Sequence, residues 1–317
     1  MSHNSIVIVG AGQAGYQVAA SLRQEGFEGA VTLIGDEPGV PYQRPPLSKA
    51  YLLGKVGVAA LRFRPPEYFD EHRITRIQGS ATAIDRERRE LVLASGERLA
   101  YEHLVLATGA RNRVPAVAGI ELGGVFGLRN LADADGLSQR LGSAKRAVVI
   151  GAGFIGLEFA AVAAARGIAV DVLELGTRPM ARALSAVTSQ VFDHAHARWG
   201  VRIHYGQSLA AIHGDGGQVR SVELASGEVL PADLVVYGIG VLPNAELAAQ
   251  AQLTVNNGIV VDAHLLTSDP AISAIGDVVS FPSPWSPQAI RLESVQNAVD
   301  QAKAVAARLM GKPAGYA

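Results

Sequence analysis

The stretch that decides the fold is IVIVGAGQAG, residues 6–15, and the chain repeats its pattern as AVVIGAGFIG at residues 147–156. In each copy, β-branched residues suited to a buried parallel strand lead directly into GxGxxG, and an alanine-rich, helix-forming segment follows. This order is typical of a dinucleotide-binding unit. The glycines let the backbone turn tightly and approach a pyrophosphate, which then lies at the N-terminus of the helix.

A carboxylate follows the second strand of each unit, where it can accept both hydroxyls of an adenosine ribose. In the first unit, Asp36 and Glu37 come after the expected strand Ala30 to Ile34. In the second, Glu174 ends the expected strand Ala169 to Leu173. A single glycine turn is a weak signal because such turns also form for steric reasons, but two complete units are a strong one. Two dinucleotides in one chain predict electron transfer between them, typically from a nicotinamide to a flavin.

The composition is that of a globular protein with room for two domains. The chain has 317 residues, 49% of them hydrophobic, and a formal net charge of −1, which gives no long-range attraction to nucleic acid or to an anionic membrane. The longest apolar stretch, residues 159–165, is too short to cross a bilayer. Residues 1–5 are polar and lead directly into the first strand, which leaves no room for a signal peptide. We therefore expect a cytoplasmic protein.

Cysteine is absent from the sequence. The chain therefore has no disulfide, thiolate metal site, iron–sulfur cluster or cysteine-based redox relay of its own. The histidines are scattered, and His194 and His196, which lie two apart in an expected helix, point to different faces. No metal-ligand spacing is present, so we expect no metal site.

The second dinucleotide unit is predicted to interrupt the first. A helix near residues 132–141 precedes it, and the chain afterwards returns to a short strand that runs into Gly276 and Asp277 and to a final helix over residues 292–309. We expect an α/β protein with two Rossmann-like domains, the second inserted in the first. The predicted boundaries are 1–110 and 241–317 for the first domain and 111–240 for the second.

A proline-rich loop, residues 38–55, follows the first carboxylate, and its prolines deny it regular structure until Leu47. A stiff loop at this position could hold Arg44 and Lys49 against the first nucleotide. The alternative is a solvated connector whose charged side chains face water.

The sequence resembles the FAD-dependent, NADH-linked ferredoxin reductases of oxygenase electron-transfer chains, of the putidaredoxin reductase and palustrisredoxin reductase type. The motifs GAGQAG, RPPLSKAYL, LATGAR, GAGFIGLE, TSDP, AIGD and ESVQNA stand in family order over nearly the whole chain. The resemblance implies the wider fold of glutathione reductase, with FAD in the first unit and NADH in the second. It also implies a ferredoxin-type iron–sulfur protein as the partner that accepts the electrons and feeds an oxygenase.

The resemblance further implies two sets of binding residues and one catalytic pair. On the FAD side these are Gly10, Gly12, Ala14 and Gly15 at the pyrophosphate, Asp36 at the ribose, Arg44 and Lys49 along the flavin, Ala81 at the adenine, Arg129 beside the cofactor, Gly276 with Asp277 at the ribityl chain, and Val295 against the ring. On the NADH side they are Gly151, Gly153, Phe154, Ile155, Gly156, Glu174, Arg182 and Gly240. Glu158 would reach the nicotinamide and pair with Lys49, which makes these two the catalytic residues.

Three features of the sequence bear on this resemblance. In disulfide reductases of this fold, the loop equivalent to residues 38–55 carries a redox-active cysteine pair, and here it has none, which suits direct transfer to a one-electron carrier. Glu174 repels a 2′-phosphate and so favours NADH over NADPH, although Arg178 and Arg182 lie nearby and would attract one. Family members continue past the equivalent of Tyr316 into a further domain, which we expect this chain to lack.

Other functions remain open on the sequence alone. A rubredoxin reductase or NADH oxidase would use the same cofactors with another acceptor. An NADH-sensing interaction module, or a plain nucleotide-binding scaffold, would use the same fold without turnover. We expect no nucleic-acid or membrane partner, and a monomer or weak dimer.

Overall fold

The computed structural model describes residues 4–312 and 315–316; residues 1–3, part of the polar start noted above, lie outside the described residues, as do 313–314 and 317. Contacts within the chain divide it into two compact units. Unit 1 consists of Met1–Gln43, Arg62–Arg111 and Pro243–Ala317, and unit 2 of Arg44–Leu61 and Asn112–Leu242. Two short strands, β8 (Ala110–Asn112) and β17 (Val241–Pro243), lie where the chain passes from one unit to the other.

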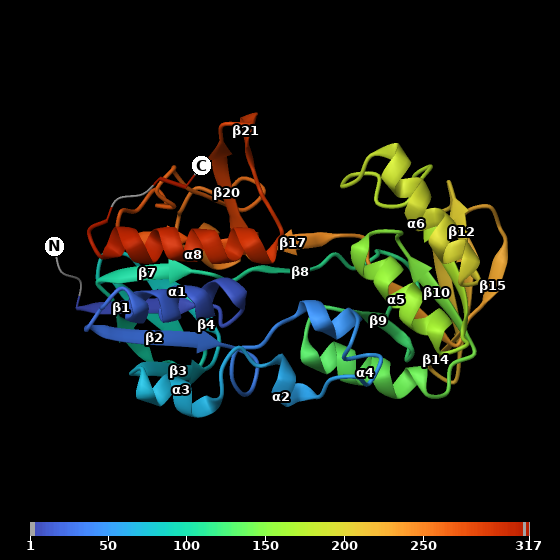
Figure 1. Cartoon of the computed structure of the whole chain (residues 1–317), viewed down its shortest axis with the longest axis horizontal. Helices are drawn as coiled ribbons and strands as arrows, with labels where there is room; N and C mark the ends of the chain where they lie inside the picture. Colours follow the sequence, from blue (N-terminus) through green and yellow to red (C-terminus); the bar gives the residue numbers. More distant parts are fainter. Residues whose placement is uncertain (1–3, 313–314, 317) are drawn as a thin grey trace. The chain divides into compact units, whose positions relative to one another are not determined.

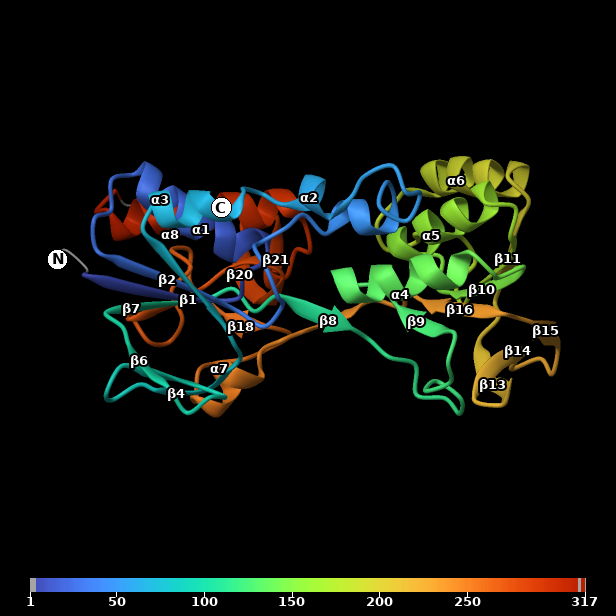
Figure 2. The ribbon, with the colours of Figure 1, turned by 90° about the horizontal axis from the view of Figure 1, so that it is seen from below.

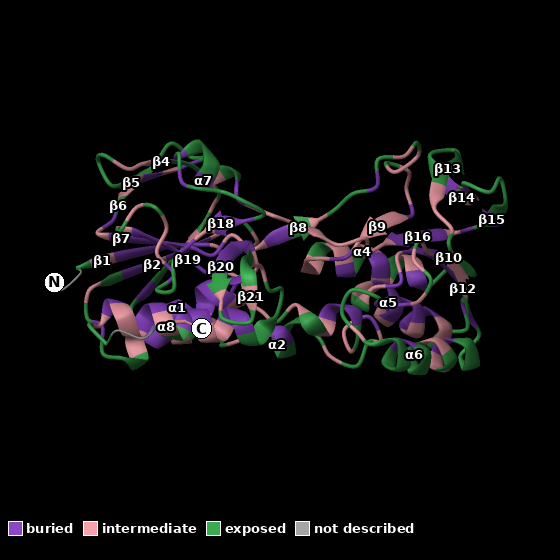
Figure 3. Cartoon of the chain, turned by 90° about the horizontal axis from the view of Figure 1, so that it is seen from above, coloured by how far each residue is buried: buried purple, intermediate pink, exposed green. Residues whose placement is uncertain are grey.

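Unit 1 is built on a five-stranded parallel sheet in the order β19-β7-β1-β2-β3. The central strand β1 carries a continuous apolar run because both faces of a parallel sheet are covered, and Ile6 and Ile8 are fully buried. Figure 3 shows the central strands of the sheet coloured as buried. The strands are β1 (Ser5–Val9), β2 (Ala30–Gly35), β3 (Ile74–Gln78), β7 (His103–Leu106) and β19 (Ile272–Ala274).

Further elements cover the two faces of this sheet. Helices α1 and α8 pack against each other on one side, and the antiparallel strands β4 to β6 lie with α7 on the other (Figure 2). The helices of the unit are α1 (Gln13–Gln24), α3 (Pro66–Glu71), α7 (Glu246–Gln250), α8 (Val295–Leu309) and the 3₁₀ turn η2 (Gly276–Val278). The remaining strands are β4 (Ala81–Asp85), β5 (Glu90–Leu93), β6 (Arg98–Ala100), β18 (Ile259–Val260), β20 (Val279–Ser283) and β21 (Ser286–Ile290).

Unit 2 repeats the plan with a parallel sheet in the order β12-β11-β10-β16-β9. Helices α5 and α6, which lie in front in Figure 1, cover one face, and the antiparallel strands β13 to β15 lie on the other (Figure 2). Apolar side chains of these strands pack in the core of the unit. The sheet strands are β9 (Val125–Gly127), β10 (Arg146–Ile150), β11 (Ala169–Glu174), β12 (Val201–Tyr205) and β16 (Leu234–Tyr237). The other elements are η1 (Pro45–Ser48), α2 (Val58–Leu61), α4 (Leu131–Leu141), α5 (Phe154–Ala165), α6 (Ala186–Arg198), β13 (Leu209–Asp215), β14 (Gln218–Leu224) and β15 (Val229–Pro231).

The segment 44–61 makes its contacts within unit 2. Its 3₁₀ turn η1 packs against α5 and α4. The Tyr51 hydroxyl donates a hydrogen bond to Asp135 Oδ1 of α4 at 2.5 Å, and this bond raises the pKa of Tyr51 to about 12. The sequence-based division includes this segment in residues 1–110 of the first domain, whereas its contacts group it with the second.

The two parallel sheets confirm the predicted α/β class with two Rossmann-like units. Two helix starts differ from the prediction. The turn η1 starts at Pro45 rather than at Leu47, because proline fits the first turn of a helix, where no N–H is needed. Helix α8 begins at Val295 rather than Leu292, because the Ser294 hydroxyl caps it by accepting from the backbone N–H three residues later.

The expectation for the two histidines of α6 is confirmed. His194 is exposed, whereas His196 is buried. The two ring nitrogens of His196 lie 2.8 Å from the carbonyl oxygen of Phe192 and 3.0 Å from that of Leu157. His196 therefore has a structural role in holding α6 to α5.

Candidate dinucleotide sites

The first glycine turn leaves open space at the start of α1. A Cβ atom at Gly10, which has φ +108°, would lie 2.1 Å from the Ala107 carbonyl oxygen, and one at Gly15 would lie 1.8 Å from the Gly10 carbonyl oxygen. Close backbone packing therefore requires glycine at both positions. At Gly12, in contrast, a Cβ would meet nothing within 4 Å. Gly12 is the N-cap of α1 and gives it no side-chain cap. The first N–H groups of a helix have no partner within the helix, so such an uncapped start is suited to binding an anion.

The second glycine turn has the same geometry in unit 2. A Cβ at Gly151, with φ +98°, would lie 2.7 Å from the Gly238 carbonyl oxygen, and one at Gly156 would lie 2.1 Å from the Gly151 carbonyl oxygen. The middle glycine, Gly153, is the N-cap of α5 without a side-chain cap, and its nearest neighbour would be 3.6 Å away. Each unit thus fits a pyrophosphate at one helix N-terminus.

The carboxylates that follow the second strands differ in their surroundings. Asp36 is exposed directly after β2, and the described residues give it no hydrogen bond or ion pair. Its neighbour Glu37 accepts a hydrogen bond from the Tyr42 hydroxyl. Asp36 is therefore the better placed of the two to accept ribose hydroxyls.

In unit 2 the carboxylate of Glu174 holds the glycine turn. One of its oxygens accepts from the Ala152 N–H at 2.8 Å, and the other accepts from the Gly176 N–H at 2.7 Å. Since each carboxylate oxygen has a second lone pair, the side chain can still accept a ribose hydroxyl. The same backbone bonds fix its negative charge beside the turn.

The remaining FAD candidates of unit 1 lie at the ends of three elements. Gly276, with φ +81°, and Asp277 form the turn η2 after β19. A Cβ at Gly276 would lie 3.0 Å from Ala14 Cβ, so this turn lies against the first turn of α1. Ala81 begins β4 and is half-buried, and Val295 begins α8 and is exposed.

The other three FAD candidates lie in unit 2. The Arg44 guanidinium donates to the Arg129 carbonyl oxygen at 2.9 Å. The Arg129 N–H in turn donates to Asp133 Oδ2 at 2.8 Å, in the capping box that starts α4. The third candidate, Lys49, lies beside α5.

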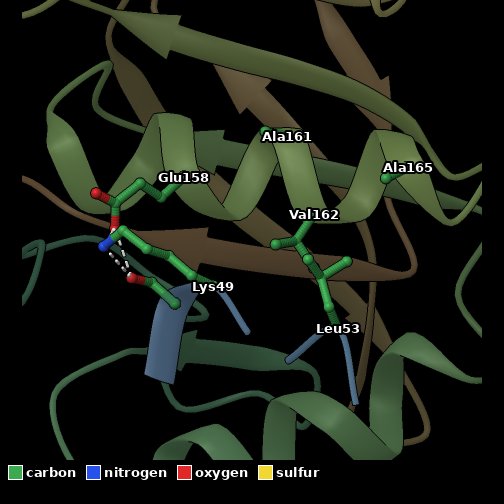
Figure 4. A pocket seen from close by; sticks show the side chains of 7 residues that line it. Lys49, Leu53, Glu158, Ala161, Val162 and Ala165 are labelled. Atoms are coloured by element: carbon green, nitrogen blue, oxygen red, sulfur yellow. Dashed lines mark hydrogen bonds and ion pairs between the residues drawn. The ribbon is translucent and has the colours of Figure 1, made fainter. Parts of the chain in front are cut away.

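The predicted pair of Lys49 and Glu158 forms in unit 2 (Figure 4). Lys49 Nζ lies 2.7 Å from Glu158 Oε2, and the same oxygen accepts from the Ser48 hydroxyl at 2.5 Å. Lys49 also donates to the Pro45 carbonyl oxygen at 3.2 Å. The lysine side chain is 49% exposed, so water screens the ion pair and the pair adds little to the stability of the fold. Its main effect is to hold the lysine ammonium in one position.

This pair lies at the polar end of a cavity of about 310 Å³. Leu53 and Val162 form its apolar end, together with two alanines of α5 (Figure 4). The hydrogen bond from Ser48 to Glu158 was not predicted from the sequence. A serine in a proline-rich loop shows no sequence pattern that links it to a glutamate 110 residues away.

The NADH candidates gather around the start of α5 and the end of β16. Phe154 is exposed and Ile155 half-buried in the first turn of α5. Gly240, with φ +101°, has the guanidinium of Arg182 beside it, 3.5 Å from where a Cβ would be. The structure therefore brings Arg182 and Gly240 together, although they lie far apart in the sequence.

Arg178 is bound to its own loop. Its terminal nitrogens donate to the carbonyl oxygens of Leu184 at 2.7 Å and Ala181 at 2.9 Å, and to Ser189 Oγ at 2.6 Å. A guanidinium with these bonds stabilises the loop before α6. Arg178 is thus less available to a 2′-phosphate than its position in the sequence indicates.

A charge cluster around the buried Asp171 joins β11 to β12. Asp171 accepts two hydrogen bonds at 2.8 Å from Arg202, and its Oδ1 lies 2.7 Å from His204 Nε2. Burial raises the pKa of Asp171, but hydrogen bonds from Arg202 and His204 outweigh it, so the pKa lies below its ordinary value. The cluster holds the edge strand β12 to β11, the strand that ends in Glu174.

Within residues 4–312 and 315–316, none of the helices has the length and apolar character needed to cross a membrane. Nor do these residues bring together three or more histidine, aspartate or glutamate side chains suited to a metal ion.

Comparison with known protein families gives a match over most of the chain. Residues 4–302 match the family described as pyridine nucleotide-disulphide oxidoreductase. The chain belongs to this family. It is therefore related to enzymes that transfer electrons from a nicotinamide, and its two glycine turns are those of a known two-dinucleotide fold.

Individual relatives are closer still. The chain is 51% identical to rhodocoxin reductase of Rhodococcus erythropolis over 313 residues, which cover 98% of this chain and 73% of that protein. It is also 51% identical to the crystal structure of the ferredoxin reductase for the CYP199A2 system from Rhodopseudomonas palustris, covering 99% of this chain and 78% of that one with a TM-score of 0.97. The covalent putidaredoxin reductase–putidaredoxin complex matches at 40% identity and a TM-score of 0.96, with 99% and 76% of the two chains covered.

These matches confirm the resemblance to the ferredoxin reductases that the sequence motifs indicated. One contrast with the family description is chemical. The family takes its name from disulphide substrates, whereas this chain contains no cysteine. A sulfur relay within the chain is therefore ruled out by composition.

Proposed function

We propose that this protein takes electrons from NADH, carries them through FAD, and passes them to a ferredoxin-type iron–sulfur protein that supplies an oxygenase. The observation that carries the proposal is the pair of glycine turns, each with open or uncrowded space at an uncapped helix N-terminus, in a chain without cysteine. Two dinucleotides and no sulfur relay suit direct transfer to a one-electron carrier. The relatives named above are reductases of such carriers.

Unit 1 supplies most of the proposed FAD site. The turn at Gly12 holds the pyrophosphate with the N–H groups that begin α1, and Asp36 accepts the ribose hydroxyls. Asp277 accepts a ribityl hydroxyl from the turn η2, whose Gly276 lies against the start of α1. The full proposed set is Gly10, Gly12, Ala14, Gly15, Asp36, Ala81, Gly276, Asp277 and Val295 in this unit, with Arg44, Lys49 and Arg129 of unit 2.

Unit 2 supplies the proposed NADH site. Gly153 receives the pyrophosphate at the start of α5, and Glu174 accepts the ribose hydroxyls. Arg182 beside Gly240 supplies positive charge at the same end of the sheet. Because Glu174 is anionic and Arg178 is bound to its loop, we expect NADH to be preferred over NADPH.

Bound FAD supplies the chemistry of accepting a hydride and releasing electrons one at a time. The chain's contribution is to place groups around that chemistry. Lys49 presents a fixed ammonium, because Glu158 and the Pro45 carbonyl hold it from two sides. A positive charge held in place stabilises the negative charge that develops on a flavin as it is reduced. The Ser48 hydroxyl donates a hydrogen bond to the Glu158 carboxylate and so helps to position the group that pairs with Lys49.

The acceptor is the part of the proposal that the sequence encodes least. The covalent complex in the comparison joins putidaredoxin reductase to putidaredoxin. By analogy we propose an iron–sulfur protein of this class as the partner of this chain. We place the activity in the cytoplasm, where NADH is produced and consumed.

The test is a panel assay. Purified protein is given NADH together with each of several ferredoxins and rubredoxins, and acceptor reduction is followed spectroscopically, with NADPH in place of NADH as the control. The proposal requires yellow protein, turnover with a ferredoxin and a clear preference for NADH. Colourless protein, turnover only with rubredoxin or oxygen, or a persistent long-wavelength absorption band with no turnover would each contradict it, and the last result would indicate an NADH sensor.

A further inference from the structure

Thr108 and Asn244 are joined by hydrogen bonds in both directions within unit 1. The Thr108 hydroxyl donates to the Asn244 carbonyl oxygen at 2.7 Å, and the Asn244 side-chain amide donates to the Thr108 carbonyl oxygen at 2.9 Å. The Asn244 N–H also donates to the Gly109 carbonyl oxygen at 2.9 Å. These three bonds, which we call the clasp, join two segments that lie 136 positions apart in the sequence.

The orientation of the Asn244 amide is fixed from two sides. Its nitrogen donates to the Thr108 carbonyl oxygen, and its Oδ1 accepts from the Arg111 guanidinium at 2.9 Å. A carbonyl only accepts and a guanidinium only donates, so turning the amide over would break both contacts. Arg111 also pairs with Glu246 at 2.6 Å, but these side chains are 50% and 57% exposed and water screens the ion pair. The clasp therefore depends chiefly on the half-buried bonds of Thr108 and Asn244.

The clasped segment packs directly against the first glycine turn. A Cβ at Gly10 would lie 2.1 Å from the Ala107 carbonyl oxygen and 3.1 Å from the Thr108 backbone nitrogen. The Ala107 N–H donates to the Val9 carbonyl oxygen at 2.7 Å, so the ends of the neighbouring strands β7 and β1 are also joined. Because this contact leaves no room for even a methyl group, a displaced Thr108 would displace the glycine turn as well.

The clasp lies where the chain leaves unit 1 and where it returns. Strand β8 directly follows Gly109, and Asn244 directly follows β17, with residues 112–242 of unit 2 between them. The entropic cost of holding two chain ends together grows with the length of the segment between them. Strands β8 and β17 pair with each other, and the clasp adds three bonds at the unit 1 end of this pair.

We propose that Thr108 and Asn244 are positioning residues for FAD, whose clasp holds residues 107–109 against Gly10 and so keeps the pyrophosphate-binding turn in its binding shape. The inference rests on the proposed function, because it takes the turn at Gly10 to bind FAD. It does not require either side chain to touch the dinucleotide. Without the clasp, FAD has to order the turn as it binds, and this ordering weakens its affinity.

The test compares Thr108→Val with Thr267→Val. Both threonines are half-buried in unit 1 and donate their hydroxyls to backbone carbonyl oxygens, and valine keeps the shape of the side chain. Thr267 precedes β19, and no ligand role is proposed for it. The full chain is stripped of flavin, and the FAD dissociation constant is measured by quenching of flavin fluorescence.

We expect Thr108→Val to weaken FAD binding about three- to tenfold relative to Thr267→Val, with no greater loss of Tm in the apo-protein. Thr108→Ser keeps the hydroxyl and should bind FAD within about twofold of wild type. Asn244→Asp keeps an acceptor for Arg111, but its carboxylate cannot donate to the Thr108 carbonyl oxygen. It should weaken FAD binding as Thr108→Val does, so the test does not depend on the folding of one variant.

Amide hydrogen exchange of the flavin-free chain gives a second measurement, in which FAD takes no part. Peptides that cover residues 10–15 should exchange faster in Thr108→Val than in wild type or in Thr267→Val, because the clasp no longer holds the turn. A purely structural role would lower the Tm without this local change.

Three results overturn the inference while the proposed function stands. In the first, Thr108→Val and Asn244→Asp bind FAD as tightly as Thr267→Val does. In the second, Thr108→Ser loses as much affinity as Thr108→Val, so that the hydroxyl is not the cause. In the third, exchange at residues 10–15 is unchanged. If the wild-type chain itself binds no FAD, the proposed function fails and the inference fails with it.

Discussion

Replacing Gly12 by alanine tests the FAD cradle with a single methyl group. Gly12 has φ −79° and ψ −162°, an extended conformation that alanine adopts without strain, and a Cβ there would meet nothing within 4 Å. The apo-protein should therefore stay folded. It should even gain about 0.4–1 kcal/mol of stability, because alanine lowers the conformational entropy of the unfolded chain.

The same methyl group would occupy the space that the proposal gives to the FAD pyrophosphate. Forcing an extra methyl group into a filled contact costs about 1–3 kcal/mol. FAD binding should therefore weaken roughly 5- to 150-fold. We therefore predict that Gly12→Ala weakens FAD binding while the apo-protein keeps its stability.

The assay is a titration of flavin-free protein with FAD, followed by fluorescence quenching, together with thermal unfolding of the same samples. Gly57→Ala is the matched control, since a Cβ there also meets nothing within 4 Å and no ligand role is proposed for it. Gly15→Ala is the contrasting variant. Its Cβ would lie 1.8 Å from the Gly10 carbonyl oxygen, so it should disrupt the fold. If Gly12→Ala binds FAD as tightly as Gly57→Ala does, the space at Gly12 does not hold the pyrophosphate and the reasoning is refuted.

Three further predictions concern unit 2. Lys49→Ala should slow flavin reduction by NADH in stopped flow by roughly tenfold or more while changing FAD affinity little, because it removes a fixed positive charge; an unchanged reduction rate would count against the role. Glu174→Gln should raise the KM for NADH and cost about 1 kcal/mol of stability, because an amide nitrogen cannot accept one of the two backbone N–H groups. The variant should not come to prefer NADPH, since Arg178 stays bound to its loop, and steady-state KM values for both nucleotides check this. Asp171→Asn should lose roughly 1–2 kcal/mol at pH 7 in urea unfolding. Because the folded-state pKa of Asp171 is lowered, the wild-type advantage is present above the ordinary carboxyl pKa and should disappear as pH falls through the lowered value; an advantage that persists at lower pH would contradict the assignment.

Local sequence was sufficient wherever the physical constraint is local. The glycine spacing of each motif predicts which positions cannot carry a side chain. A Cβ at Gly10 or Gly15 would indeed collide with a neighbouring backbone oxygen. The apolar runs of β1 and β10 identify central strands because both faces of a parallel sheet are buried. The pair of Lys49 and Glu158 came from family resemblance, since no spacing rule links residues 109 positions apart.

Contacts between distant segments could be read only from the tertiary structure. Three such contacts depend on how the elements pack. They are the hydrogen bond from Ser48 to Glu158, the hydrogen bond that Gln301 accepts from the Gly276 N–H, and the grouping of residues 44–61 with unit 2. The same holds for Arg178, whose charge is visible in the sequence but whose hydrogen bonds to its loop are not. The sequence by itself therefore determined the two nucleotide-binding units and their carboxylates, because backbone sterics and burial act over a few residues. Only the tertiary structure showed which distant side chains stabilise those units. Their hydrogen bonds depend on positions in space and produce no periodic pattern in the sequence.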